Sequence, residues 1–180
     1  MKKYSLWLTV VLLGAGLLWG LVSGGNTSTP SAGGASLDPA MAARISLHYA
    51  ERADVLLTLD EDRVWTLQPE NHPADAEAVQ HLLQNLAAMQ VVRVVAHHHA
   101  HDASLALDEA QAIGLSVQDK QGKVLLRMQI GKSATDMLST YVRIGEQEEV
   151  LAVDQALVWQ VRRMRDAWLA PRKVLSENKT

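Results

Sequence analysis

The chain has 180 residues, with 17 Lys and Arg against 20 Asp and Glu, and so carries a formal net charge of −3. This mildly acidic balance argues against a nucleic-acid-binding protein, which would carry a basic stripe. Cysteine is absent, which excludes disulfides, thiol catalysis and cysteine-based zinc sites. Once a leader is set aside, the length suits one domain and hardly two.

The start of the chain decides where the remainder is expected to lie. Residues 6–22 (LWLTVVLLGAGLLWGLV) contain no charge and follow Lys2 and Lys3. As a helix this stretch would be about 26 Å long, close to the ~30 Å hydrocarbon core of a bilayer. Because the lysines precede it, the N-terminus is expected to stay in the cytoplasm. We therefore expect a single-pass inner-membrane anchor over residues 1–22 and a periplasmic C-terminal domain.

A cleaved secretory signal peptide is the alternative interpretation of this segment, with Val22-Ser23-Gly24 as its cleavage site. The apolar run is longer than is usual for a signal, which favours the uncleaved anchor. Gly16 and Gly20 form a Gly-x-x-x-Gly pattern, a spacing that lets two membrane helices approach closely. They predict self-association or pairing with a partner's membrane helix, against the simpler explanation of ordinary glycine content.

Behind the anchor, composition predicts a flexible Gly/Ser/Thr linker over residues 23–37, a folded domain over 38–170 and a polar tail over 171–180. The domain should begin with a short helical lead-in over 38–43. Alternation and polar turns then predict an antiparallel meander, with strands over 44–49, 55–59 and 63–67.

An amphipathic helix is expected over residues 76–90, with Asp75 as its N-cap. Its apolar residues recur with helical spacing and form one continuous stripe: Val79, Leu82, Leu83, Leu86 and Met89. A β-branched strand over 91–96 should follow it.

The second half of the domain repeats this outline. Asp108 is expected to cap a short helix over 109–113 that ends at Gly114, and four strands should follow, over 115–118, 123–130, 140–144 and 150–153. Asp154 should cap a last helix reaching about Trp168, with Leu157, Val161, Met164 and Trp168 as its apolar stripe. The predicted fold class is α+β: antiparallel β-sheet with packed amphipathic helices, and a duplication of two similar halves.

Several short motifs, in their order along the chain, resemble the bacterial family called domain of unknown function 4340. They comprise Trp65, a Pro-x-x-x-Pro-Ala-Asp segment (69–75), Val-Val-Arg (91–93), Ile-Gly-Leu (113–115), Ile-Gly-Lys (130–132), Thr-Tyr-Val-Arg (140–143) and Arg-Asp-x-Trp-Leu (165–169). The resemblance covers about residues 44–170. It implies an exported or membrane-anchored protein, and an association with transporters of the gliding-motility type. It supplies no catalytic residues.

The histidine run is the most distinctive local feature of the sequence. If the strand over 91–96 continued through it, His97, His99 and His101 would point to one side. Imidazoles are good ligands for zinc, copper or nickel, so these three residues form a candidate metal site. The simpler explanation is a solvated strand end or loop. A role in sensing pH is a further alternative, because imidazole titrates near neutrality.

Near the C-terminus, Arg162, Arg163 and Arg165 make the chain basic. They are candidates for contact with an acidic partner or anionic lipid headgroups, against the simpler explanation of a solvated helix face. No Gly-x-Ser-x-Gly is present, and Leu126 stands where a phosphate-binding loop before Gly131-Lys132-Ser133 would need its first glycine.

From these features we expect a non-catalytic, membrane-tethered interaction module of a membrane complex, without a cofactor and without nucleic acid as a partner. Metal binding through the histidine run is the alternative function.

Overall fold

The computed structural model describes residues 37–171. Every described residue belongs to one compact unit of the chain. The predicted anchor with Gly16 and Gly20 lies outside the described residues, as do most of the linker and of the polar tail. Among the helices over residues 37–171, none has both the length and the apolar character needed to cross a bilayer.

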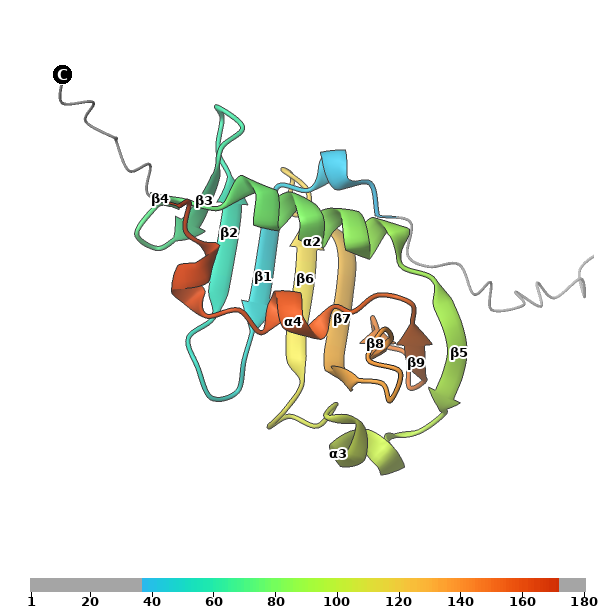
Figure 1. The fold of residues 1–180 in the computed structure, drawn as a ribbon. Coiled ribbons are helices and arrows are strands. Elements are labelled where there is room, and N and C mark those ends of the chain that lie inside the picture. The colour runs from blue at the N-terminus through green and yellow to red at the C-terminus, as the bar shows by residue number, and fades with distance from the viewer. Residues whose placement is uncertain (1–36, 172–180) are drawn as a thin grey trace, which may run out of the picture. The chain divides into compact units, whose positions relative to one another are not determined.

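The domain is mixed α+β, built on a single antiparallel sheet of nine strands (Figure 1). Its spatial order is β4-β3-β2-β1-β6-β7-β8-β9-β5. The strands are β1 (Arg44–His48), β2 (Val55–Leu59), β3 (Trp65–Gln68), β4 (His72–Pro73), β5 (Val91–Ala96), β6 (Ile113–Gln118), β7 (Val124–Ser133), β8 (Thr140–Ile144) and β9 (Val150–Val153). The predicted strands over 55–59, 91–96, 140–144 and 150–153 are confirmed at their predicted bounds.

Two meanders run outward from the central pair of strands, β1 and β6. The first places β2, β3 and β4 on one side, and the second places β7, β8 and β9 on the other. β5 follows the first meander along the chain but pairs with β9 at the far edge of the second. The two meanders therefore form one continuous sheet.

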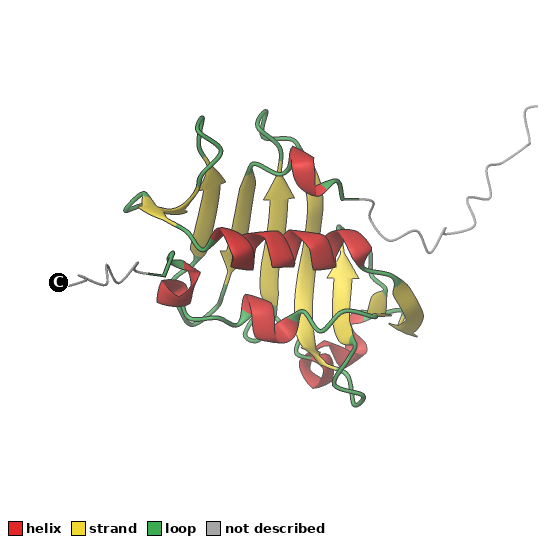
Figure 2. Ribbon diagram, turned by 45° about the horizontal axis from the view of Figure 1, so that its top comes forward, coloured by secondary structure: helices red, strands yellow, loops and turns green. Residues whose placement is uncertain are grey.

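Helix α2 (Ala76–Ala88) covers one face of the sheet and supplies much of the main core. The N-cap prediction is confirmed, because an Asp75 carboxylate oxygen accepts a hydrogen bond from the Ala78 N–H at 3.1 Å. All five predicted stripe residues, Val79, Leu82, Leu83, Leu86 and Met89, are buried. Figure 2 shows α2 lying across the strands, with the shorter α4 (Val158–Val161) on the same face.

The prediction of one continuous C-terminal helix capped by Asp154 is wrong. The chain forms α4, leaves the helix, and then forms the 3₁₀ helix η3 (Arg165–Trp168). Asp154 instead accepts a hydrogen bond from the Gln90 N–H at 2.8 Å. The Trp168 carbonyl accepts from the Asp75 N–H at 2.8 Å, which draws this segment back against the start of α2. Trp168 is buried as predicted, whereas Met164 is 72% exposed.

The short helix predicted over 109–113 is also wrong. Asp108 does accept a hydrogen bond from the Gln111 N–H at 3.0 Å, but this contact closes only a turn. Ile113 and Gly114 belong to β6, where Ile113 pairs with Ile130 and is buried in the core. Burial of Ile113 between strands outweighs the local capping signal.

The opposite face of the sheet carries a smaller hydrophobic cluster at the β8–β9–β5 end. The segment formed by η2 (His99–His101) and α3 (Asp102–Leu105) covers this end. Its contact with β7 is close: a Cβ built on Gly131 would lie 2.3 Å from the Leu105 carbonyl oxygen. We call residues 99–105 the η2–α3 segment; beside it this face of the sheet carries a cleft.

Candidate functional site

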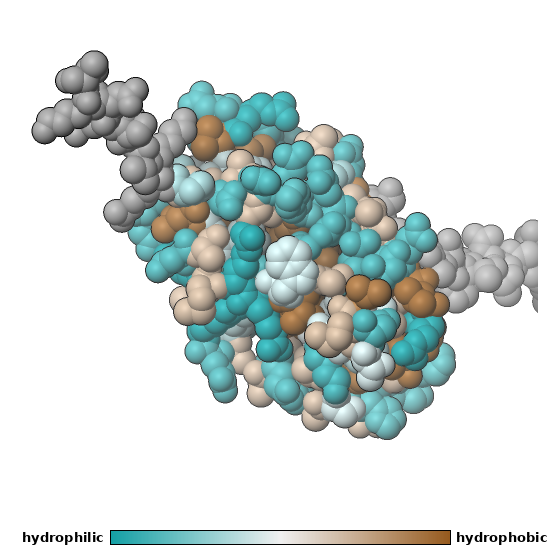
Figure 3. Space-filling model, viewed as in Figure 1, coloured by the Kyte–Doolittle hydropathy of each residue, from teal (hydrophilic) through white to brown (hydrophobic). Residues whose placement is uncertain are grey.

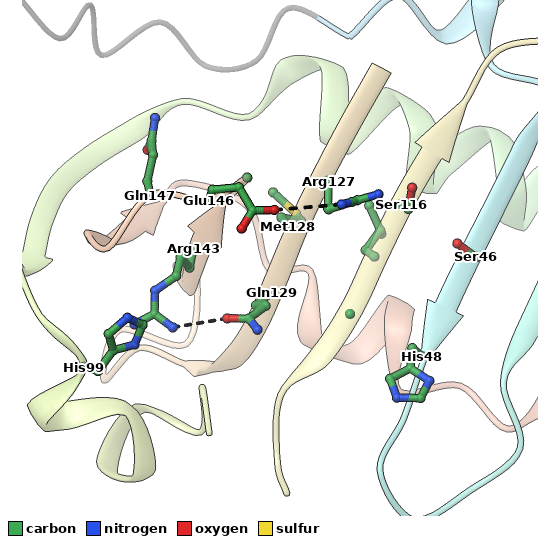
Figure 4. A pocket seen from close by; sticks show the side chains of 13 residues that line it. Ser46, His48, His99, Ser116, Arg127, Met128, Gln129, Arg143, Glu146 and Gln147 are labelled. Atoms are coloured by element: carbon green, nitrogen blue, oxygen red, sulfur yellow. Dashed lines mark hydrogen bonds and ion pairs between the residues drawn. The ribbon is translucent and has the colours of Figure 1, made fainter. Parts of the chain in front are cut away.

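A cleft of about 460 Å³ lies on this second face of the sheet, beside the η2–α3 segment (Figure 4). Alternation along the strands turns polar residues into it. On β1, for example, Ile45 and Leu47 are buried in the core, whereas Ser46 and His48 line the cleft. Alternate residues of the same strands therefore face opposite sides of the sheet: one set packs in the main core, and the other set lines the cleft.

Strand pairing arranges the lining residues in two rows across the sheet. The first row is His48, Gly114, Gln129 and Arg143, on β1, β6, β7 and β8. The second row is Ser46, Ser116 and Arg127, on β1, β6 and β7. Backbone pairing therefore fixes the relative positions of these side chains.

Gly114 forms part of the floor of the cleft, between His48 and Gln129. A Cβ at this position would meet the His48 Cβ at 3.4 Å, which is ordinary van der Waals contact. Glycine is therefore not required here by backbone strain or by a close approach. Its effect is to leave the first row hollow where a larger side chain would fill it.

Arg143 is the charged residue that the fold buries at one end of the first row, at 5% exposure. Its Nη2 donates to Asp102 Oδ1 at 2.6 Å, and its Nη1 donates to Gln129 Oε1 at 3.1 Å. Asp102 Oδ2 also lies 2.8 Å from His99 Nδ1. Because Asp102 is the first residue of α3, these contacts join the η2–α3 segment to β7 and β8.

The environment of Asp102 favours its charged form. Burial acts to raise the pKa of this carboxyl, but the hydrogen bonds from Arg143 and His99, with the attraction of both groups, outweigh burial and lower the pKa. Asp102 is thus held as a carboxylate that compensates the charge of Arg143.

Arg127, in the second row, has a much looser partner. Its Nη1 lies 3.9 Å from Glu146 Oε1, and the two side chains are 57% and 93% exposed. An exposed pair at this distance contributes little to stability. The Arg127 guanidinium is therefore accessible from the cleft.

Two buried polar atoms of the cleft residues have no hydrogen-bond partner among the described residues: Arg143 Nε and Ser116 Oγ. A buried donor without a partner costs about 1–3 kcal/mol. Of the four such side-chain atoms in the described part of the chain, two belong to this cleft. Both atoms are shielded from solvent, so they are polar groups that the fold leaves without a partner beside the cleft.

The histidine run does not continue β5, so that premise of the metal prediction is wrong. The strand ends at Ala96, and His99–His101 form the 3₁₀ helix η2. His97 Nδ1 lies 3.1 Å from Glu149, whereas His99 Nδ1 faces Asp102. Across residues 37–171, no cluster of three or more His, Asp or Glu could hold a metal ion. Metal binding by His97, His99 and His101 thus loses the shared strand face on which it depended.

The three arginines near the C-terminus have different surroundings. The Arg163 guanidinium lies over the Trp168 ring, 5.3 Å from its centroid, and 4.0 Å from an Asp75 carboxylate oxygen. Arg165 donates to the Gln68 carbonyl at 2.6 Å and pairs with Glu70. Arg162 is exposed. Arg163 and Arg165 therefore attach the C-terminal segment to the domain, which leaves Arg162 as the freest of the three for an outside partner.

The family described as Domain of unknown function (DUF4340) matches residues 65–176. This match covers more than half of the chain, and the chain belongs to that family. The match begins at Trp65 in β3, later than the start near residue 44 that the resemblance implied. No match was found among curated proteins or among solved structures.

The sequence did not predict the Arg143–Asp102–Gln129 contacts. One signal was present: Arg143 alternates with Val142 and Ile144 in a strand otherwise rich in β-branched and aromatic residues. An arginine at such a position must either leave the sheet or be paired within it. Its partner Asp102 is 41 residues away, so the pairing required the fold.

Proposed function

We propose that this protein is a non-catalytic interaction module, tethered to the inner membrane by residues 1–22 and placed in the periplasm as an accessory of a membrane complex. Its partner is a protein of that complex, and a transporter is the class that the family resemblance favours. The observation that carries the proposal is the open polar cleft on the sheet face opposite α2 and α4.

The arrangement of the cleft residues supports binding better than catalysis. Its two hydroxyls, Ser46 and Ser116, lie in the second row, and neither is hydrogen-bonded to an imidazole within the described residues. The His48 imidazole pairs with Asp54 at 3.0 Å instead. A nucleophile activated by a base would need those groups in contact.

The helix-bearing face offers less to a partner. Figure 3 shows its hydrophobic residues in small groups separated by hydrophilic ones. Trp159 and Met164 are 60% and 72% exposed there, as single large side chains. Scattered exposed apolar residues are normal on soluble domains, so we assign the partner to the cleft.

The duplication of two halves remains part of this proposal. Two observations support it. Strands β1–β4 and β6–β9 are each ordered outward from the central pair β1 and β6, and each meander is followed by a helix on the same face of the sheet. Asp154 does not repeat the capping role of Asp75, so the likeness is one of topology.

The test is photocrosslinking in membranes of cells that make the full chain. A photoreactive residue replaces Gln147, an exposed residue on the cleft, or Gln84, an exposed residue of α2. The proposal expects a discrete adduct with a membrane protein from position 147 and none from position 84. Adducts that form from position 84 alone would contradict the assignment of the partner to the cleft. Release of the chain from the membranes by carbonate washing would contradict the membrane anchor.

A further inference from the structure

We propose that the cleft binds a single carboxylate, the side chain of an aspartate or glutamate of the partner protein. This inference rests on the proposed function and adds to it the chemistry of the ligand. The Arg127 guanidinium is the cationic contact, and the Gln129 amide on the same strand supplies neutral donors.

Hydrogen-bond donors without a partner lie at this part of the cleft. Gln129 uses its carbonyl oxygen to accept from Arg143, which leaves its amide N–H groups as donors without an acceptor among the described residues. The Ser116 hydroxyl lies on the strand next to Arg127 and directly opposite it in register, but it is buried and pairs with no group of the described chain. A ligand that brings oxygen acceptors would satisfy the Gln129 N–H groups.

The charges around the cleft select a ligand with one negative charge. Arg143 is already compensated by Asp102 at 2.6 Å, and Arg127 has only the distant Glu146. These four charges sum to zero. A single carboxylate that takes the place of Glu146 keeps this balance, whereas a phosphate dianion would leave an uncompensated charge beside two resident carboxylates.

Glu146 occupies, in the free protein, the position of the ligand carboxylate. It lies in the turn between β8 and β9, is 93% exposed, and reaches Arg127 only at 3.9 Å. A carboxylate with ideal geometry on a guanidinium accepts two parallel hydrogen bonds at shorter distance. The ligand therefore displaces Glu146 at little cost.

Binding is tested on the full chain in detergent micelles, labelled with ¹⁵N at glycine. The probe is N-acetylglutamate amide, and N-acetylglutamine amide is its uncharged match. Gly114 and Gly145 line the cleft, and Gly122 does not. We expect the Gly114 and Gly145 amide signals to shift with a Kd of about 1–10 mM for a ligand this small, with no response from Gly122 and none to the glutamine compound.

Three variants define the contact. Arg127→Gln should weaken binding about tenfold or more, because a charge-assisted hydrogen bond is lost. Lys132→Gln removes the same charge from an exposed residue of the same strand, outside the cleft, and should leave binding unchanged. Glu146→Gln should tighten binding about two- to fivefold, because the competing carboxylate is gone.

Shifts that survive Arg127→Gln, or shifts produced by inorganic phosphate and not by the glutamate amide, would overturn the inference. So would the absence of any shift. These outcomes are separate from failure of the proposed function. If membrane crosslinks form normally from position 147 but the glutamate amide does not bind, only the inference of a carboxylate ligand is refuted. Carboxylate binding without a membrane crosslink would refute only the protein partner.

Discussion

Arg143 is a charged side chain that the domain buries. Its side chain is 6% exposed, and its guanidinium relies on Asp102 for a counter-charge and on Gln129 for an acceptor. A buried ion pair is not by itself a source of stability, but removal of one partner leaves the other charge buried and uncompensated. The pair therefore acts as a constraint that fixes the η2–α3 segment beside the cleft.

Asp102→Asn should destabilise the fold by about 3 kcal/mol, because Arg143 would stay buried without its counter-charge. The free energy of unfolding in urea measures this loss. Asp166→Asn is the matched control: Asp166 is exposed and should change the free energy by less than about 0.5 kcal/mol. Equal effects of the two substitutions would show that the Arg143–Asp102 pair has no special role.

The stability that Asp102 contributes should be lost in strongly acidic solution. Its pKa in the folded protein lies below its ordinary value of 3.8, so the unfolded chain takes up the proton first as pH falls. The contribution is complete above that value and is lost as pH falls through the folded pKa. The stability difference between the protein and Asp102→Asn should narrow as pH falls below about pH 4.

This difference between the two proteins isolates Asp102 from the other carboxyls. The hydrogen bond from His48 lowers the pKa of Asp54 too, and Ser139 does the same for Asp136. Both groups weaken the two proteins equally as they become protonated. A difference that does not narrow as pH falls below about pH 4 would contradict the assignment.

At the scale of elements, the contact between the η2–α3 segment and β7 shapes one wall of the cleft. Gly131 permits this contact, and Ala106 ends α3 in the left-handed conformation with φ of 57°. The close approach at Gly131 involves backbone, so the segment cannot relax by rotating a side chain. The position of His99 and Asp102 at the cleft depends on this approach.

Gly131→Ala should therefore destabilise the domain by about 1–3 kcal/mol and displace the segment. Urea unfolding measures the stability, and limited proteolysis across residues 98–108 measures the displacement. Gly114→Ala is the control, because its Cβ would meet only ordinary contact; its stability should change by less than about 1 kcal/mol. Unchanged proteolysis of Gly131→Ala would contradict the proposed contact.

Elements with strong periodicity could be predicted from the sequence, and elements fixed by distant contacts could not. The stripe from Val79 to Met89 predicted α2 and its buried face, and alternation predicted most strands. The start of α4 depends instead on Thr140, whose hydroxyl donates to the Gln155 carbonyl at 2.6 Å and accepts from the Leu157 N–H at 3.0 Å. At the break after α4, the Arg52 guanidinium donates to the backbone carbonyls of Val161, Arg162 and Arg163. No local pattern in residues 154–168 contains that information.

At the scale of the whole described domain, the two faces of the sheet have different roles. One face buries the main core under α2 and α4, and the other carries the η2–α3 segment and the polar cleft. The sequence predicted the first face because apolar periodicity reports burial. The cleft escaped prediction because its two rows combine single polar residues from β1, β6, β7 and β8, which only strand order brings together.

The proposed contact with the membrane partner is a single carboxylate side chain that this cleft receives through the Arg127 guanidinium. The most direct measurement is the yield of the photocrosslinked adduct from position 147 in native membranes, compared between Arg127→Gln and Lys132→Gln in the full chain. We predict that the adduct is lost or strongly reduced in Arg127→Gln and retained in Lys132→Gln. Equal yields in the two variants would contradict the account.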